Sequence, residues 1–186
     1  IDTKAEPPDE PLLFFKPPSS LIGPGQSIIL PEASERVDFE GELAVVISKI
    51  IRSTPAEMAH EAIFGLTCAN DITARDLQTK DNQWARAKGF DTFLPMGPWI
   101  TRDLDYKDLA IETFVNLEPR QKSSTQSMVF QIDQLISYIS GIMTLYPGDV
   151  ILTGTPAGVG PLKPGDQVEV RIEGIGALVN NVSVPE

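Results

Sequence analysis

Three carboxylates in two short segments are the residues of this sequence best suited to chemistry. Glu40 and Glu42 lie two positions apart within residues 38–43, and Asp71 comes later in the chain. In a β-strand residues i and i+2 point to the same face, so we expect the two glutamates to project side by side. Like charges about 6–7 Å apart repel one another unless a cation lies between them. A solvated strand face is the alternative interpretation of this pair.

Asp71 gives the pair a third partner. It ends a predicted strand that passes into a helical turn at residues 73–76, which has the pattern of a capping box. Asp71 could act as a helix cap. Joined to Glu40 and Glu42, it would complete an all-oxygen site for a hard divalent cation, Mg²⁺ or Mn²⁺ by default and Ca²⁺ as an alternative. Three carboxylates leave half of an octahedral coordination sphere for water and substrate, which is typical of a catalytic site.

Positive groups and backbone donors occur where an anionic substrate would need them. Three carboxylates and one divalent cation leave a charge of about −1, which disfavours an anion unless other groups offset it. The sequence offers Arg75, Lys88 and the glycine-rich segment 153–160, which follows a predicted buried strand. This segment can direct successive N–H groups and the Thr155 hydroxyl at a carboxylate. It lacks the spacings of nucleotide-binding loops, which argues against a nucleotide ligand.

The elements that position these residues are predicted to be mostly short strands. Sixteen prolines and 14 glycines among 186 residues indicate many turns and few long helices. Alternating or continuous apolar residues predict strands over residues 27–30, 37–47, 66–72, 110–117, 150–153, 167–172 and 177–184. In the strand over residues 37–47, which carries the glutamates, we expect one end to be exposed and the other buried.

Two helices are predicted. One covers about Pro55 to Phe64, because residues 54–57 resemble a capping box and Gly65 can end a helix. The other covers residues 132–143, where the apolar spacing predicts a core-facing stripe. The members of that stripe are Ile132, Leu135, Ile136, Ile139, Ile142 and Met143.

Composition limits the classes of partner. The chain has 26 acidic and 15 basic side chains and a net charge of −11 at pH 7, which argues against a nucleic acid or a membrane surface as partner. No apolar run reaches the roughly 18 residues of a membrane-spanning helix. The single cysteine, Cys68, is interpreted as a small buried hydrophobe, and the lack of a second cysteine favours a reducing compartment, with the cytoplasm as the prediction and an organelle as the alternative. The length predicts one domain. Because the sequence begins with Ile1, we expect further residues to precede it.

Six ordered motifs resemble those of the fumarylacetoacetate hydrolase family. They lie at residues 16–23, 39–46, 70–78, 87–91, 147–151 and 153–160. The resemblance implies a catalytic domain over residues 12–186, preceded by a polar segment, residues 1–11, that could be the remnant of a lid. The implied fold is α+β, with β-rich mixed sheets and few short helices, and members of the family are usually homodimers.

The resemblance also implies residue roles and a class of reaction. Glu40, Glu42 and Asp71 would bind Mg²⁺ or Mn²⁺, and Lys88 would be the catalytic residue that faces the substrate. Substrate binding would fall to Arg75, Gln78, Gly154 and Thr155. Family members act on 2-oxo and β-diketo acids by acylpyruvate hydrolysis, oxaloacetate decarboxylation or keto–enol isomerisation. All of these reactions pass through an enolate, whose charge a cation can stabilise.

One departure from the family pattern leaves the reaction open. Family hydrolases activate water with a His and a Glu in a lid that precedes the segment at residues 11–15, and this sequence has no counterpart of that pair. Its single histidine, His60, lies in a predicted helix and is interpreted as structural or surface-exposed. C–C hydrolysis or decarboxylation is the leading prediction if a lid exists, keto–enol isomerisation is the alternative, and an inactive metal- or acid-binding module is the alternative of another class. A smaller departure is Leu117 after Asn116, where the family commonly has glycine, and we expect it to alter a hairpin turn.

Overall fold

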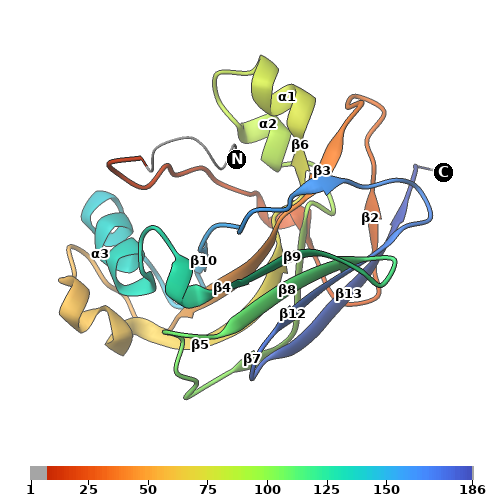
Figure 1. Cartoon of the computed structure of the whole chain (residues 1–186). Coiled ribbons are helices and arrows are strands. Elements are labelled where there is room, and N and C mark those ends of the chain that lie inside the picture. Colours follow the sequence, from red (N-terminus) through yellow and green to blue (C-terminus); the bar gives the residue numbers. More distant parts are fainter. Residues whose placement is uncertain (1–7, 186) are drawn as a thin grey trace.

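The fold is built from three β-sheets and a few short helices (Figure 1). The computed structural model describes residues 8–185. Strand pairs are mostly antiparallel, with parallel pairs between β1 and β7 and between β2 and β13, so the predicted β-rich α+β class with mixed sheets is confirmed. The predicted segment 1–11 lies mostly outside the described residues, and the domain boundary at Leu12 stays a prediction.

The first five-stranded sheet carries Glu42. Its order is β1 (Leu21–Ile22), β7 (Leu94–Thr101), β5 (Ile63–Asn70), β4 (Gly41–Ile47) and β10 (Val150–Leu152). Strand β4 runs antiparallel to both β5 and β10. All residues of β4 are buried, because its continuous apolar run faces packed side chains on both sides of the sheet.

The second five-stranded sheet lies across the molecule from the helices (Figure 1). Its order is β2 (Ser27–Ile29), β13 (Gly176–Ser183), β12 (Gln167–Ile172), β8 (Ala110–Val115) and β9 (Glu118–Ser124). Burial alternates along β8 and β12, so one face of this sheet packs on the core and the other faces outward.

The third sheet is small and joins three segments that are far apart in the chain. Its order is β11 (Gly160–Pro161), β3 (Val37–Phe39) and β6 (Thr73–Ala74). Asp38 pairs with Thr73 on one side and with Pro161 on the other. This pairing places the segment before Glu40 beside the segment that follows Asp71 and next to the end of the glycine-rich loop.

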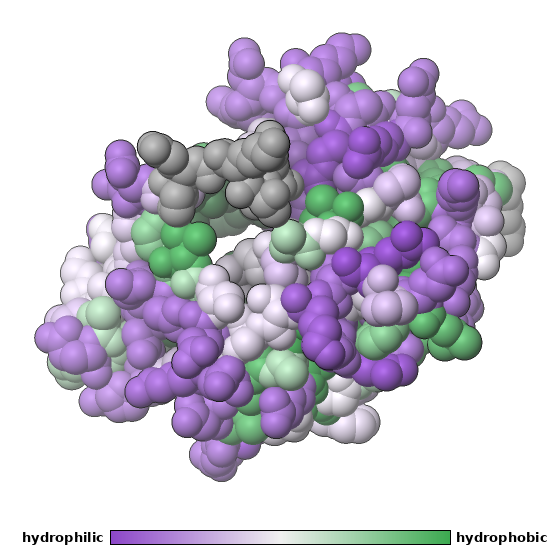
Figure 2. Space-filling model, viewed as in Figure 1, coloured by the Kyte–Doolittle hydropathy of each residue, from purple (hydrophilic) through white to green (hydrophobic). Residues whose placement is uncertain are grey.

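The helices cover two separate parts of the molecule. They are α1 (Arg75–Lys80), α2 (Ala85–Lys88), α3 (Ile132–Ile142) and the 3₁₀ segments η1 (Pro18–Ser20), η2 (Ala56–Ala62) and η3 (Thr125–Ser127). Helices α1 and α2 lie together above the small sheet, and α3 lies apart from them beside η2 (Figure 1). Hydrophilic side chains gather over α1 and α2 on the face shown in Figure 2. No helix among residues 8–185 is long and apolar enough to cross a membrane.

Two hydrophobic clusters meet at the segment that carries the carboxylates. The first cluster includes Leu43 and Val45 of β4 and packs against α3, β5 and β12. The second includes Val37 and Phe39 of β3 and packs against α1, α2 and β12. Glu40 and Glu42 therefore lie where the chain passes from one cluster to the other, between apolar anchors on either side.

The prediction of one continuous strand over residues 37–47 is wrong at Glu40. The strand breaks there into β3 and β4, since the Glu40 N–H donates to the Asn70 side chain and the Glu40 carbonyl accepts from the Asp71 N–H. The expected exposed end is also wrong, because every residue of β3 is buried, including Asp38. Ion pairs to Arg36 and Arg75 satisfy that carboxylate.

The two predicted capping boxes are wrong as well. Residues 56–62 form a 3₁₀ segment whose N-cap is Pro55, with no side-chain cap, and Gly65 continues into β5 instead of ending a helix. Thr73 belongs to β6, and its hydroxyl donates to the Asp71 carbonyl. Helix α1 therefore begins only at Arg75, and the Asp71 carboxylate is free of any capping role.

The long helix is confirmed as α3, with most of its predicted stripe. Its four N-terminal stripe residues are buried, and three of them, Ile132, Ile136 and Ile139, belong to the first cluster, whereas Ile142 is exposed and Met143 is the C-cap. Cys68 is a buried hydrophobe as predicted, and burial raises the pKa of its thiol to about 12. His60 lies exposed in η2.

Candidate active site

The structure brings the three predicted carboxylates together. Glu40, Glu42 and Asp71 each offer one oxygen, and these oxygens lie within 4.8 Å of one another. All three residues are buried, with 6%, 3% and 1% of their surface exposed. Glu40 lies at the break between β3 and β4, Glu42 lies in β4, and Asp71 follows β5. We call these residues the carboxylate trio.

Backbone hydrogen bonds around the strand break hold the trio together. Asn70 at the end of β5 pairs with Gly41, and its side-chain oxygen accepts from the Glu40 N–H at 2.9 Å. The Asp71 N–H donates to the Glu40 carbonyl at 2.8 Å. Gly41 itself must be glycine, because a Cβ there would collide with the Thr113 hydroxyl. The Asn-Asp pair and the glycine between the glutamates are thus the local sequence features that build the site.

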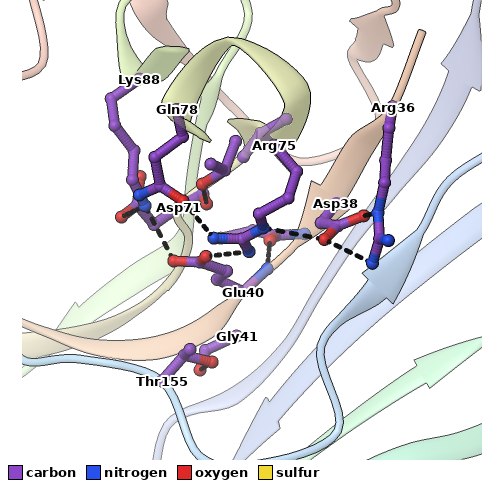
Figure 3. A network of polar contacts seen from close by, with 12 residues as sticks. Arg36, Asp38, Glu40, Gly41, Asp71, Arg75, Gln78, Lys88 and Thr155 are labelled. Carbon is purple, nitrogen blue, oxygen red and sulfur yellow. Dashed lines mark hydrogen bonds and ion pairs between the residues drawn. The ribbon is translucent and has the colours of Figure 1, made fainter. Parts of the chain in front are cut away.

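Two lysines bind the trio. The Lys88 ammonium lies 2.8 Å from Glu40 Oε2 and 2.5 Å from Asp71 Oδ2 (Figure 3). Burial alone would lower the pKa of Lys88. The charges of Asp71 and Glu40 outweigh burial, so the pKa is raised and Lys88 is held in its charged form. The Lys16 ammonium lies 2.8 Å from Asp71 Oδ1 and also donates to the carbonyls of Ile72 and Lys88. For Lys16, burial outweighs the attraction of Asp71 and lowers the pKa.

An aromatic wall closes the lysine side of the site. The Phe14 ring centroid lies 4.7 Å from Lys88 Nζ, and the same ring packs against Trp84 at 5.7 Å. A ring at this position keeps water from the buried ammonium and adds a cation–π contact.

Arg75 binds the outer oxygen of Glu40. One of its terminal nitrogens, Nη2, donates to Glu40 Oε1, Nη1 donates to Gln78 Oε1 at 2.6 Å, and Nε donates to Asp38 Oδ2 at 2.9 Å (Figure 3). The predicted residues Arg75 and Gln78 therefore lie beside the trio, on the first turn of α1.

The glycine-rich loop reaches the trio from the opposite side. The Gly154 N–H donates to Glu42 Oε2 at 2.7 Å, and this turn has the positive φ that glycine adopts readily. The Thr155 hydroxyl donates to the Gly41 carbonyl at 2.9 Å and accepts from Gln121. Gly154 and Thr155, the two loop residues predicted to bind substrate, therefore lie beside the start of β4. In this structure their donors are directed at the protein itself.

The donor set fits a hard divalent cation. Among the described residues the only hydrogen-bond donor to the Glu42 carboxylate is the Gly154 N–H. Burial, followed by the charges of Asp71 and Glu40, raises the pKa of Glu42 well above its ordinary value. Three converging carboxylates with one charge left poorly compensated match the all-oxygen ligands that Mg²⁺ and Mn²⁺ prefer.

Sequence reasoning did not assign Lys16, Asp38 or Phe14 to the site. Lys16 opens the first of the six motifs, and it meets Asp71 across 55 positions of the chain. Asp38 stands at the start of the carboxylate segment between two apolar residues, an arrangement that is common on exposed strand faces. Only the folded structure shows that the Lys16 side chain is buried against Asp71 and the Asp38 side chain against Arg75.

Comparison with known proteins decides the family. The family model described as fumarylacetoacetate (FAA) hydrolase C-terminal matches residues 2–183. The chain belongs to the fumarylacetoacetate hydrolase family. The resemblance inferred from the six motifs is thereby confirmed, together with the implied type of fold.

Three members of the fumarylacetoacetate hydrolase family that are similar to this chain are named for an enzymatic activity. It is 48% identical to the mitochondrial oxaloacetate tautomerase FAHD2A of Bos taurus over 94% of this chain and 60% of that protein. The crystal structure of 5-carboxymethyl-2-hydroxymuconate delta-isomerase from Mycobacterium smegmatis matches with a TM-score of 0.94 and 50% identity, over 96% of this chain and 71% of that chain. The crystal structure of 2-hydroxyhepta-2,4-diene-1,7-dioate isomerase from Mycobacterium marinum matches with the same TM-score and 48% identity, over 95% and 70%.

Proposed function

We propose that this chain is the catalytic domain of a divalent-metal-dependent enzyme that acts on a 2-oxo or β-diketo acid through an enolate. The observation that carries the proposal is the buried carboxylate trio, with oxygens within 4.8 Å of one another and a charged lysine beside them. Glu40, Glu42 and Asp71 would hold Mg²⁺ or Mn²⁺, with Ca²⁺ as an alternative. A divalent cation held there would supply a Lewis acid that stabilises negative charge developing on the 2-oxo oxygen.

Lys88 would be the catalytic residue. Its ammonium is kept charged by Glu40 and Asp71 and is shielded by the Phe14 ring, so it presents a fixed positive group that is largely removed from water. At Nζ it would stabilise the negative charge of the enolate as the keto and enol forms interconvert, while the protons that leave and enter the substrate exchange with water.

The remaining predicted residues would orient the substrate. Gln78 gives its side-chain oxygen to Arg75, which leaves its –NH₂ group as a donor for a carboxylate. On the other side of the trio, the Gly154 N–H and the Thr155 hydroxyl are the donors that could turn to a substrate carboxylate when it enters.

Keto–enol interconversion is the reaction we would test first. The related proteins named above are a tautomerase and two isomerases, and the trio with Lys88 offers the positive charge that an enolate requires. Hydrolysis of an acylpyruvate and decarboxylation of oxaloacetate share the same enolate and remain the second candidates. Hydrolysis also requires a group that activates water, and the one histidine of the sequence is exposed in η2.

The deciding experiment measures three reactions of the full chain with and without Mg²⁺ or Mn²⁺. Loss of the ultraviolet absorbance of enol-oxaloacetate reports tautomerisation, pyruvate release from oxaloacetate reports decarboxylation, and loss of acetylpyruvate reports hydrolysis. We expect metal-dependent turnover in at least one assay and its loss in Glu42→Ala. The matched control is Glu61→Ala, which removes an exposed carboxylate of η2 that pairs with Lys49.

Two outcomes would contradict the proposal in different ways. Activity that survives Glu42→Ala would refute the proposed site. Tight metal binding without turnover of these substrates would favour the inactive metal- or acid-binding module. A homodimer, a cytoplasmic location and the lack of nucleic-acid or membrane partners stay predictions, and light scattering of the purified chain tests the first of them.

A further inference from the structure

Asp38 is a buried carboxylate that lies outside the trio. None of its surface is exposed, and it sits in β3 two residues before Glu40. Its Oδ1 accepts from Arg36 Nε at 2.9 Å, and its Oδ2 accepts from Arg36 Nη2 at 3.2 Å and from Arg75 Nε at 2.9 Å. A buried ion pair often adds little net stability, because removing its charges from water is costly. We therefore look for a role of Asp38 other than stability.

Arg75 is the link from Asp38 to the site. Its guanidinium is planar, and three of its nitrogens are bound at once, by Asp38, Gln78 and Glu40 (Figure 3). Asp38 holds the Nε corner, which is the corner nearest the backbone. With that corner fixed, the plane of the guanidinium and the direction of both terminal nitrogens are fixed too.

The orientation of Arg75 sets the orientation of Glu40. Because Arg75 occupies Oε1, the other oxygen of Glu40 is turned toward Lys88 Nζ, 2.8 Å away, and into the trio. The same guanidinium takes the oxygen of Gln78, which leaves the –NH₂ group of that side chain as a donor. One buried carboxylate thus governs a predicted metal ligand and a predicted substrate-binding residue.

We propose that Asp38 is a positioning residue that acts through Arg75 to orient Glu40 for the metal and Gln78 for the substrate. The inference rests on the proposed function, because it assigns Asp38 a role in the same site. Arg36, whose side chain is half exposed, serves as the outer brace of Asp38. The Ser34 hydroxyl and the Glu35 N–H donate to the Asp76 carboxylate, so the segment before β3 is fixed to the first turn of α1.

The test is the Asp38→Asn variant, measured first without substrate. Titration of the metal-free chain with Mn²⁺ by calorimetry should show a dissociation constant 10- to 100-fold higher than in the parent chain, the usual effect of losing a partner of a metal ligand. In steady-state assays KM should rise more than kcat falls, because Gln78 binds substrate while Lys88 is left in place. The control for lost stability is Ile136→Val, which leaves a small cavity in the first hydrophobic cluster, away from Asp38. It should leave the Mn²⁺ dissociation constant within twofold of the parent value.

A double-mutant cycle separates positioning from a merely structural role. If Asp38 acts through Arg75, adding Asp38→Asn to Arg75→Met should weaken Mn²⁺ binding by less than a further factor of two. Additive losses, or an Asp38→Asn variant that binds Mn²⁺ as the parent does, would overturn the inference. Should Asp38→Asn fail to fold, Asp38→Glu takes its place, since it keeps the charge and displaces Arg75. A parent chain that binds no Mn²⁺ would overturn the proposed function itself, and with it this inference.

Discussion

The two sides of the carboxylate trio are built differently. Glu40 and Asp71 each have both oxygens bound by cations, from Arg75, Lys88 and Lys16. Among the described residues Glu42 receives a single backbone N–H, from Gly154. The difference indicates that the protein itself holds two of the three carboxylates in place, while the charge of the third is poorly compensated.

The strongest test of the fixed side removes Lys88. Lys88→Met should lower kcat by about 10²- to 10⁴-fold, the range found when a positioned proton donor or charge-stabilising group is lost. Mn²⁺ binding should persist, because the trio is unchanged and a competing cation has gone. Steady-state kinetics and calorimetry on the same preparation check both results. Lys49→Met, which removes an exposed ammonium on the surface, should leave both unchanged. A Lys88→Met variant with parental kcat would contradict the catalytic role.

Removal of Lys16 should weaken the fixed side at Asp71. Lys16→Met leaves Asp71 Oδ1 without its cation and frees the Lys88 carbonyl, so the carboxylate and the end of α2 lose a common anchor. We expect metal affinity to fall by roughly 10- to 100-fold, with kcat at saturating metal reduced less. Titration with Mn²⁺ measures the effect. Lys16→Arg is the matched control, and it should recover part of the affinity. Equal affinity in Lys16→Met and the parent chain would show that Asp71 is held without Lys16.

Glu42 offers the opposite test, because it is the poorly compensated side. Its pKa is raised in the folded chain, so above about pH 4.5, where the unfolded carboxylate has lost its proton, the folded state binds more protons than the unfolded state. The metal-free chain should lose stability from this group as pH rises through that window. Glu42→Gln should abolish metal binding and stabilise the metal-free chain at pH 7 by roughly 1–3 kcal/mol.

Urea denaturation in the presence of EDTA, at pH 5 and pH 7, measures this effect. The gain from Glu42→Gln should be smaller at pH 5 than at pH 7. When EDTA is replaced by Mg²⁺, the ion should stabilise the parent chain but not the variant. A Glu42→Gln variant that is less stable than the metal-free parent at pH 7 would show that the charge of Glu42 is already compensated.

The smallest expected effect lies far from the trio, in the hairpin between β8 and β9. Asn116 and Leu117 form its turn, with φ of 53° and 68°, and Leu117 is exposed. A leucine is strained at positive φ by about 1–2 kcal/mol, and glycine recovers most of this at some cost in chain entropy. Leu117→Gly should therefore stabilise the chain by roughly 0.5–1 kcal/mol, with metal affinity unchanged. Thermal denaturation and Mn²⁺ titration check the pair of results, and a change in affinity would show that the hairpin communicates with the site.

Local patterns in the sequence predicted the parts of the molecule that local patterns control. The spacing of Glu40 and Glu42, Asp71 at a strand end and the apolar stripe of α3 all correspond to features of the structure. Leu117 lies in a hairpin turn, beyond the end of β8 at Val115, and the expectation that it alters this turn stays a prediction.

The strands that were missed have no local apolar pattern. Strand β7 contains Pro95, Gly97 and Pro98, which argue against a strand in the sequence, and β9 is mostly exposed and polar, so neither has an apolar alternation. Lys16 and Asp38 are likewise ordinary charged residues until the chain folds. Their roles follow from pairing with Asp71 and Arg75, which no spacing along the chain encodes.

The small sheet of β11, β3 and β6 has a consequence for assembly. It joins strands that start at positions 37, 73 and 160, so the sheet that fixes the segment before Glu40 is complete only after the chain from β3 to β11 has come together. Contacts between such remote segments form late and slowly during folding. A divalent ion bound as proposed would therefore recognise the complete site only after this sheet has formed. Protection from proteolysis by Mg²⁺ would then report complete maturation, and fragments that lack either end of this arrangement should show none.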